Sequence, residues 1–363
     1  MLALSVTVLA LALSIAPADA AKKKAVVVAV AAQPVVAPTL HPSPPEIVAA
    51  APAADWVAID PNDLMVMELA PGAKGKPRRV VIQLMPAPFS QGWVGNIRKL
   101  VAAKFWDGTS VYRVQDNYVA QWGDAESDDP KKAKAMPEGL VSVPESAYVT
   151  PVVYSRTSNS DKLDPPFKLP LNVDEFGWQM DPLVGEGERA LRIPGASGFS
   201  AGWPVGYIGK DQRNGKEFGQ VATMWPIHCY GMVGVGRNLS PDTGTGAELY
   251  TVIGHAPRHL DRNIALIGRV IEGMEHLSSL PRGTGPLGFY ESVEERTPIL
   301  SVRIMSQMAQ DKPFPEYEYL GTESASFAKY ADARANRRDP FFIRPAGGAD
   351  ICNIPVPVRR RVR

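Results

Sequence analysis

The sequence predicts a mainly all-β fold, a closed antiparallel barrel capped by two helices and interrupted by a long loop-rich insertion. Short runs of β-branched and apolar residues recur along the chain between glycines and prolines. Proline makes up 34 of 363 residues, which is nearly twice the usual share of about 5%. Because proline breaks helices, long helices are disfavoured. Only two stretches carry apolar residues at helical spacing. Many short strands with two helices are typical of a closed barrel.

Composition excludes several classes of protein. Apolar residues make up 45% of the chain and charged residues 21%, as in ordinary globular proteins. Lysine and arginine number 39 against 38 acidic residues, and this balance argues against a domain that grips a polyanion over its surface. We therefore expect no nucleic-acid partner.

The N-terminus resembles a secretory signal. Residues 2–16 form an apolar run that ends in Pro17-Ala18-Asp19-Ala20, the small-x-small pattern of a cleavage site. The run is shorter than the roughly 20 residues that span a bilayer, which favours a signal peptide over residues 1–20 above a membrane anchor. No lysine or arginine precedes the run. We expect cleavage near Ala20, a periplasmic or secreted protein, and no integral membrane span.

The folded domain is expected over residues 56–310, after an extended Ala/Pro-rich linker at 21–55. A first amphipathic helix is predicted around Trp93–Lys104, and a second is predicted from the spacing of Ile271, Met274, Leu277 and Leu280. The predicted strands are Leu64–Leu69, Arg79–Leu84, Ser110–Val114, Tyr118–Trp122, Met224–Val235, Leu249–Ile253, Ile264–Val270 and Ile299–Met305.

Two segments fall outside this pattern. Residues 125–220 read as a polar, Pro- and Gly-rich insertion, which we expect to be ordered and to border the functional groove through its own aromatics: Trp178, Phe199, Trp203 and Tyr207. Residues 311–363 read as a basic C-terminal tail. Its part from Ala331 onward has eight arginines against three aspartates.

Two further motif matches give little support for a function. Gly198-Phe199-Ser200-Ala201-Gly202 matches the nucleophile elbow of hydrolases, but the flanking prolines do not allow the helix that must follow the serine. His255 and His259 have the spacing of zinc ligands on a helix, yet Pro257 lies between them. Neither motif calls for a cofactor or a metal.

Cys229 and Cys352 are the only cysteines. Two cysteines of an exported protein can pair. However, Cys229 lies in an apolar run typical of a buried strand and Cys352 lies in the tail. The pairing stays open, and free thiols are favoured.

Two distant blocks resemble the cyclophilins. Residues 105–114, FWDGTSVYRV, and 118–124, YVAQWGD, resemble that family's Y-D-G-T-x-F-H-R-V and G-F-x-x-Q-G-G-D segments. Residues 260–274, LDRNIALIGRVIEGM, resemble its L-D-G-x-x-x-x-F-G-x-V-x-x-G-M block. The resemblance covers about Leu64–Gln307. It implies an eight-stranded antiparallel barrel capped by two helices, in agreement with the independent count above.

The resemblance also implies a peptidyl-prolyl cis-trans isomerase acting on proline-containing polypeptides as a monomer. Its catalytic arginine corresponds to Arg113, with Gln121 beside it, and an arginine aimed at the prolyl nitrogen would weaken amide resonance. The substrate-binding positions it implies are Tyr118, Val119, Glu248, Tyr250, His259 and Leu260.

The chain departs from the family pattern at the site. Tyr112 replaces the histidine before the arginine, Ile264 replaces a second histidine, and Glu248 replaces a glutamine. We expect Glu248 to pair with Arg113 and lower activity. Two functions therefore remain open: an active isomerase of exported proteins, or a binding or scaffold protein that holds Pro-containing segments without turning them over.

Overall fold

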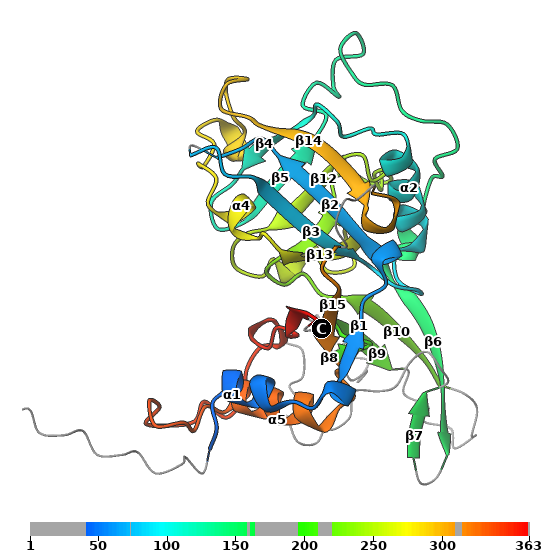
Figure 1. Ribbon diagram of the computed structural model, residues 1–363. Helices are drawn as coiled ribbons and strands as arrows, with labels where there is room; N and C mark the ends of the chain where they lie inside the picture. The colour runs from blue at the N-terminus through cyan, green and yellow to red at the C-terminus, as the bar shows by residue number, and fades with distance from the viewer. Residues whose placement is uncertain are drawn as a thin grey trace, which may run out of the picture. The chain divides into compact units, whose positions relative to one another are not determined.

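The computed structural model describes residues 41–72, 74–157, 160–163, 195–209, 220–308 and 314–361. Its centre is a closed antiparallel barrel of eight strands, which confirms the predicted fold (Figure 1). In spatial order the strands are β11 (Met232–Val235), β12 (Leu249–Val252), β5 (Val119–Gly123), β4 (Ser110–Val114), β14 (Thr297–Ile304), β2 (Leu64–Leu69), β3 (Arg78–Leu84) and β13 (Leu266–Glu272). Pairing of β13 with β11 closes the barrel.

The helix predicted beside the barrel is α2 (Gln91–Ala102). It buries Trp93, Ile97, Leu100 and Val101 against the barrel core, as its spacing predicted. The second helix is shorter than expected. α4 spans only Glu275–Ser278 because β13 continues through Ile271 and Gly273 then turns the chain with φ +81°.

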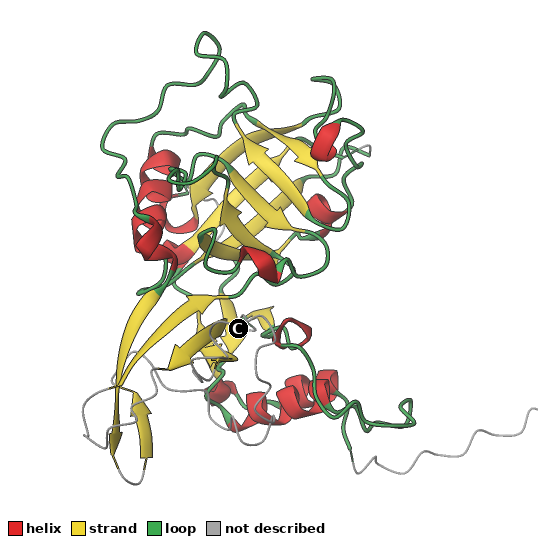
Figure 2. Ribbon diagram, turned by 180° about the vertical axis from the view of Figure 1, so that it is seen from behind, coloured by secondary structure: helices red, strands yellow, loops and turns green. Residues whose placement is uncertain are grey.

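A five-stranded sheet arises from the insertion. Its strands are β7 (Ser160–Leu163), β6 (Thr150–Thr157), β10 (Gln220–Pro226), β9 (Trp203–Gly209) and β8 (Gly195–Ser200) (Figure 2). The strand predicted over Met224–Val235 was therefore wrong: it divides between β10 and β11, because Pro226 ends β10. The GFSAG motif forms the hairpin between β8 and β9, so no helix follows Ser200.

The segments expected to be linker and tail also carry regular structure. Part of the predicted linker forms α1 (Pro44–Ala50), which begins with proline at its first turn and a capping box between Ser43 and Glu46. The predicted tail supplies α5 (Ala325–Ala335). It also supplies two strands of a sheet whose members are β1 (Trp56–Ala58), β15 (Tyr317–Leu320) and β16 (Val358–Arg360).

Several of the tail arginines are paired with acids. Arg359 contacts Glu318 at 2.7 Å and lies 3.7 Å from the centroid of the Trp56 ring. Arg360 contacts Glu272 of β13 at 2.5 Å. These pairs attach β16 to its neighbours.

Cys229 and Cys352 form a disulfide, so the preference for free thiols was wrong. The two residues are 123 positions apart in sequence, and the contact depends on the folded C-terminal segment. No helix among the described residues is long and apolar enough to cross a membrane.

Candidate functional site

Arg113 projects from β4, where the register places it opposite Gln121 of β5. Its Nη1 donates to Gln121 Oε1 at 2.9 Å, and its Nε donates to the Leu287 carbonyl at 2.8 Å. Nη2 donates to Gln115 Oε1, and the guanidinium lies 5.3 Å from the centroid of the Phe289 ring. Burial lowers the pKa of Arg113, but a guanidinium remains charged at neutral pH.

All three of these acceptors are neutral. Within the described part of the chain, no carboxylate forms an ion pair with Arg113. The guanidinium is therefore fixed in place without a neighbouring carboxylate to offset its positive charge.

A cavity of about 640 Å³ brings most of the predicted site together. Its walls include Arg113, Tyr118, Val119, Gln121, Glu248, Tyr250 and Leu260. His259 does not line it: this exposed histidine stacks on Tyr118 outside, with ring centroids 6.2 Å apart. The resemblance thus selected residues from four separate segments that meet at one cavity.

The expected pair between Glu248 and Arg113 was wrong. Glu248 Oε2 accepts a hydrogen bond from the Tyr112 hydroxyl at 2.5 Å, and Oε1 accepts from the Asp124 backbone N–H at 2.8 Å. The reason is the register of β12 on β5, which pairs Leu249 with Trp122 and so directs the preceding residue toward the end of β5. Burial raises the pKa of Glu248 to about 8, although both hydrogen bonds act in the opposite direction.

The sequence analysis did not identify His228 and Asp261, two buried polar residues beside the cavity, as site residues. His228 contacts the hydroxyl of Tyr250 through Nε2 and the carboxylate of Asp261 through Nδ1, both at 2.9 Å. The available signal was a histidine inside the otherwise apolar run 224–235.

Among the described residues of the insertion, those that border the cavity all belong to its first part. Ala125, Ser127, Asp128 and Met136 lie in the cavity wall. Trp203 instead lies against Arg269 of β13, with the guanidinium carbon 4.4 Å from the ring centroid, and does not line the cavity. Trp178 and the side chain of Tyr207 are outside the described residues.

Metal binding has no support in the described segments, where no group of three or more His, Cys, Asp or Glu side chains could hold an ion. His259 lies within the short 3-10 turn Arg258–Leu260 and His255 precedes that turn, so the two histidines do not share a helix face.

Comparisons with known proteins agree with this geometry. The family model of the cyclophilin-type peptidyl-prolyl cis-trans isomerase/CLD matches residues 76–306, a range that contains every barrel strand except β2. Among solved structures, the chain is similar to cyclophilin AquaCyp293 from Hirschia baltica, with a TM-score of 0.55 and 22% identity over 84% of this chain and 92% of that one. No curated protein matches the chain.

Proposed function

The chain belongs to the cyclophilin-type peptidyl-prolyl cis-trans isomerases, and we propose that it isomerises X-Pro bonds in exported proteins with Arg113 as the donor to the prolyl amide. The supporting observation is the state of Arg113, which is held at the cavity by neutral acceptors and keeps its charge. The protein acts as a monomer on proline-containing polypeptides.

The chemistry requires little more than a positioned donor. Rotation about a peptide bond faces a barrier of ~18–20 kcal/mol because of amide resonance. As the amide twists, the lone pair becomes localised on the prolyl nitrogen. A cation directed at that nitrogen stabilises the twisted state more than either planar state, which is the condition for catalysis.

The rest of the cavity holds the substrate. Tyr118, Val119 and Leu260 supply apolar surface for the proline ring, while Gln121 fixes the guanidinium. A proline ring held still allows the preceding carbonyl to turn relative to it. The first part of the insertion, at Ser127 and Met136, extends the wall for longer substrates.

A protease-coupled assay on a short X-Pro peptide tests this proposal. We expect the protein to accelerate the cis-to-trans step in proportion to its concentration. Binding of the peptide, observed by NMR titration, without any acceleration would favour the scaffold function instead. The replacement of the family histidine by Tyr112 is the departure that supports that alternative.

Export is supported by the apolar run at 2–16 and by the disulfide, since disulfides persist in oxidising compartments. The mature protein is then expected to begin at Ala21. Intact-mass measurement on periplasmic material checks this, and a mass that includes residues 1–20 would contradict it.

A further inference from the structure

His228 lies between β10 and β11 and is completely buried against the cavity wall. Its ring lies nearly parallel to that of Tyr250, at 13° with centroids 6.3 Å apart. Nε2 is 2.9 Å from the Tyr250 hydroxyl, and Nδ1 is 2.9 Å from Asp261 Oδ1. The histidine therefore joins a cavity residue to a buried carboxylate behind it.

The direction of these hydrogen bonds follows from the acid. Asp261 Oδ1 also accepts from the His228 backbone N–H at 2.9 Å, and Oδ2 accepts from Arg258 Nε at 2.7 Å. A carboxylate so placed accepts a hydrogen bond from Nδ1–H, and burial lowers the pKa of His228, so the ring is neutral. Nε2 is then an acceptor, and the Tyr250 hydroxyl donates to it.

The opposite strand leaves room for this tyrosine. Gly234 of β11 pairs directly with Tyr250 of β12. A Cβ atom at Gly234 would lie only 2.3 Å from the Tyr250 hydroxyl oxygen. The phenol thus occupies space that any other residue at Gly234 would fill, and His228 is its hydrogen-bond partner there.

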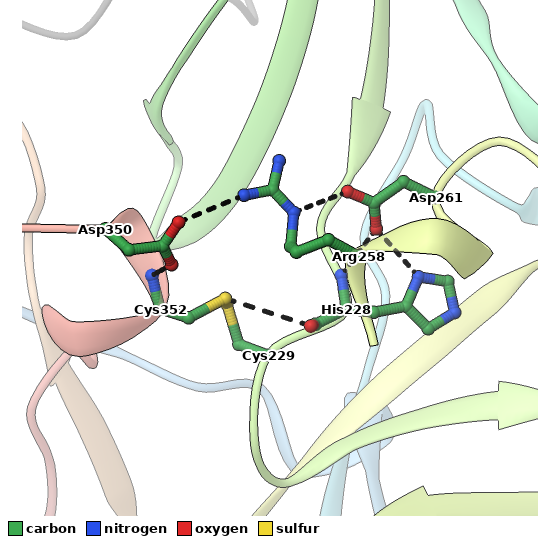
Figure 3. The surroundings of a disulfide bond; sticks show 6 residues. All are labelled: His228, Cys229, Arg258, Asp261, Asp350 and Cys352. Atoms are coloured by element: carbon green, nitrogen blue, oxygen red, sulfur yellow. Dashed lines mark hydrogen bonds and ion pairs between the residues drawn. A yellow bond between two sulfur atoms is a disulfide. The ribbon is translucent and has the colours of Figure 1, made fainter. Parts of the chain in front are cut away.

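The chain of contacts continues to the C-terminal segment (Figure 3). Arg258 Nη1 lies 3.3 Å from Asp350 Oδ2. Asp350 also accepts the Cys352 N–H at 2.8 Å, and Cys352 is bonded to Cys229, the residue after His228. The C-terminal segment is therefore attached near His228 at two points, through Asp350 to Arg258 and through Cys352 to Cys229.

We infer that His228 is a positioning residue for the proline cavity: it holds the Tyr250 ring in the cavity wall through the hydroxyl, with Asp261 fixing the imidazole. This inference rests on the proposed function, because Tyr250 acts only through a substrate in that cavity. Loss of the link lets the ring shift and weakens proline binding without touching Arg113.

Two substitutions test the hydrogen bonds of the two ring nitrogens one at a time. His228→Asn keeps a donor near the place of Nδ1, toward Asp261, but cannot reach Tyr250. His228→Gln keeps an acceptor near the place of Nε2, toward Tyr250. We expect His228→Asn to raise the Kd and KM for an X-Pro tetrapeptide about fivefold, as the loss of one hydrogen bond implies, with kcat within twofold. His228→Gln should stay within twofold of the unmodified protein in all three values.

A double-mutant cycle with Tyr250→Phe completes the test. In that background the hydroxyl is absent, so His228→Asn should have no further effect on the Kd. The matched control is His276→Asn, which changes a histidine of α4 far from this chain of contacts in sequence and should leave the Kd unchanged. Equal losses in His228→Asn and His228→Gln, or an undiminished loss in the Tyr250→Phe background, would overturn the inference.

The peptide Kd keeps this test distinct from that of the proposed function. A protein that binds the peptide without turnover refutes the isomerase proposal, and the Kd values of the variants still decide the role of His228. A protein that neither binds nor turns over the peptide refutes both.

Discussion

Glu248 has a partly buried carboxyl group in the cavity wall, and its protonation is linked to folding. Burial raises its pKa in the folded protein to about 8, above the ordinary value of 4.5. A raised folded-state pKa gives stability that is fully present below the unfolded value and is lost as pH rises through the folded value. The relevant window therefore runs from about pH 4.5 to pH 8.

Glu248→Gln should remove this pH dependence. The amide carries no charge to desolvate, so the variant should gain stability over the unmodified protein as pH rises from 4.5 to 8. At about 1.4 kcal/mol per pKa unit the gain reaches a few kcal/mol. Urea unfolding across this range measures it, with the exposed Glu275→Gln as control. A constant difference between variant and parent would show that Glu248 ionises normally.

Arg113→Ala should abolish most of the isomerase activity. Removing one donor of this kind costs about 10²–10³-fold in rate. The fold should persist, with the free energy of unfolding changed by no more than about 1 kcal/mol, because the guanidinium lies in a groove wall. The matched control is Arg282→Ala, which removes a surface arginine paired with Asp116 at 2.9 Å. An Arg113→Ala rate within twofold of the parent would refute the assigned role.

At the level of strands and helices, local patterns predicted the barrel well. Ser110–Val114 was predicted at its exact limits, since apolar alternation and flanking turn residues are local signals. The division of Met224–Val235 was missed because apolar residues resume directly after Pro226 and His228, so the segment reads as one apolar run. The partner of Glu248 was missed for a different reason: it depends on strand register, which residue types alone do not specify.

Long-range contacts were the least predictable. The His228–Tyr250 hydrogen bond and the Cys229–Cys352 disulfide join segments that are adjacent only after folding. The tail was taken as irregular because β15 and β16 are short and because two of the three residues of β16 are arginines, Arg359 and Arg360. Their charge is balanced across strands, by Glu318 and Glu272, rather than along the sequence.

The disulfide should contribute substantially to the stability of the C-terminal elements. It closes a span of 123 residues, and a cross-link over a loop of that length stabilises by about 3–5 kcal/mol. Cys352→Ser should lower the free energy of unfolding by this amount in urea. Dithiothreitol should lower that of the parent equally and leave Cys352→Ser unchanged. Equal stability of the oxidised and reduced parent would contradict this expectation.

For the molecule as a whole, Arg269 joins the three sheets at one point. From β13 of the barrel it donates to Gln83 Oε1 of β3 at 2.9 and 2.8 Å, through Nε and Nη2. Nη1 donates to the Gly202 carbonyl in the hairpin of the five-stranded sheet at 2.7 Å. The rings of Trp203 and Tyr319 lie 4.4 and 5.8 Å from the guanidinium carbon. Burial lowers its pKa to about 10, so it remains charged at neutral pH.

Arg269→Ala should therefore destabilise the protein as a whole while sparing the chemistry at Arg113. The variant leaves the Gly202 carbonyl and the Gln83 amide without their partner and removes the cation between two aromatic rings. Hydrogen bonds to a charged group contribute about 1.5–3 kcal/mol each, so we expect a loss of at least about 3 kcal/mol in the free energy of unfolding. Far-UV circular dichroism in urea measures the loss, and peptide turnover of the folded fraction should stay within twofold of the parent. Arg282→Ala again serves as the control, and a loss no greater than that of this surface variant would mean that the sheets are held together without Arg269.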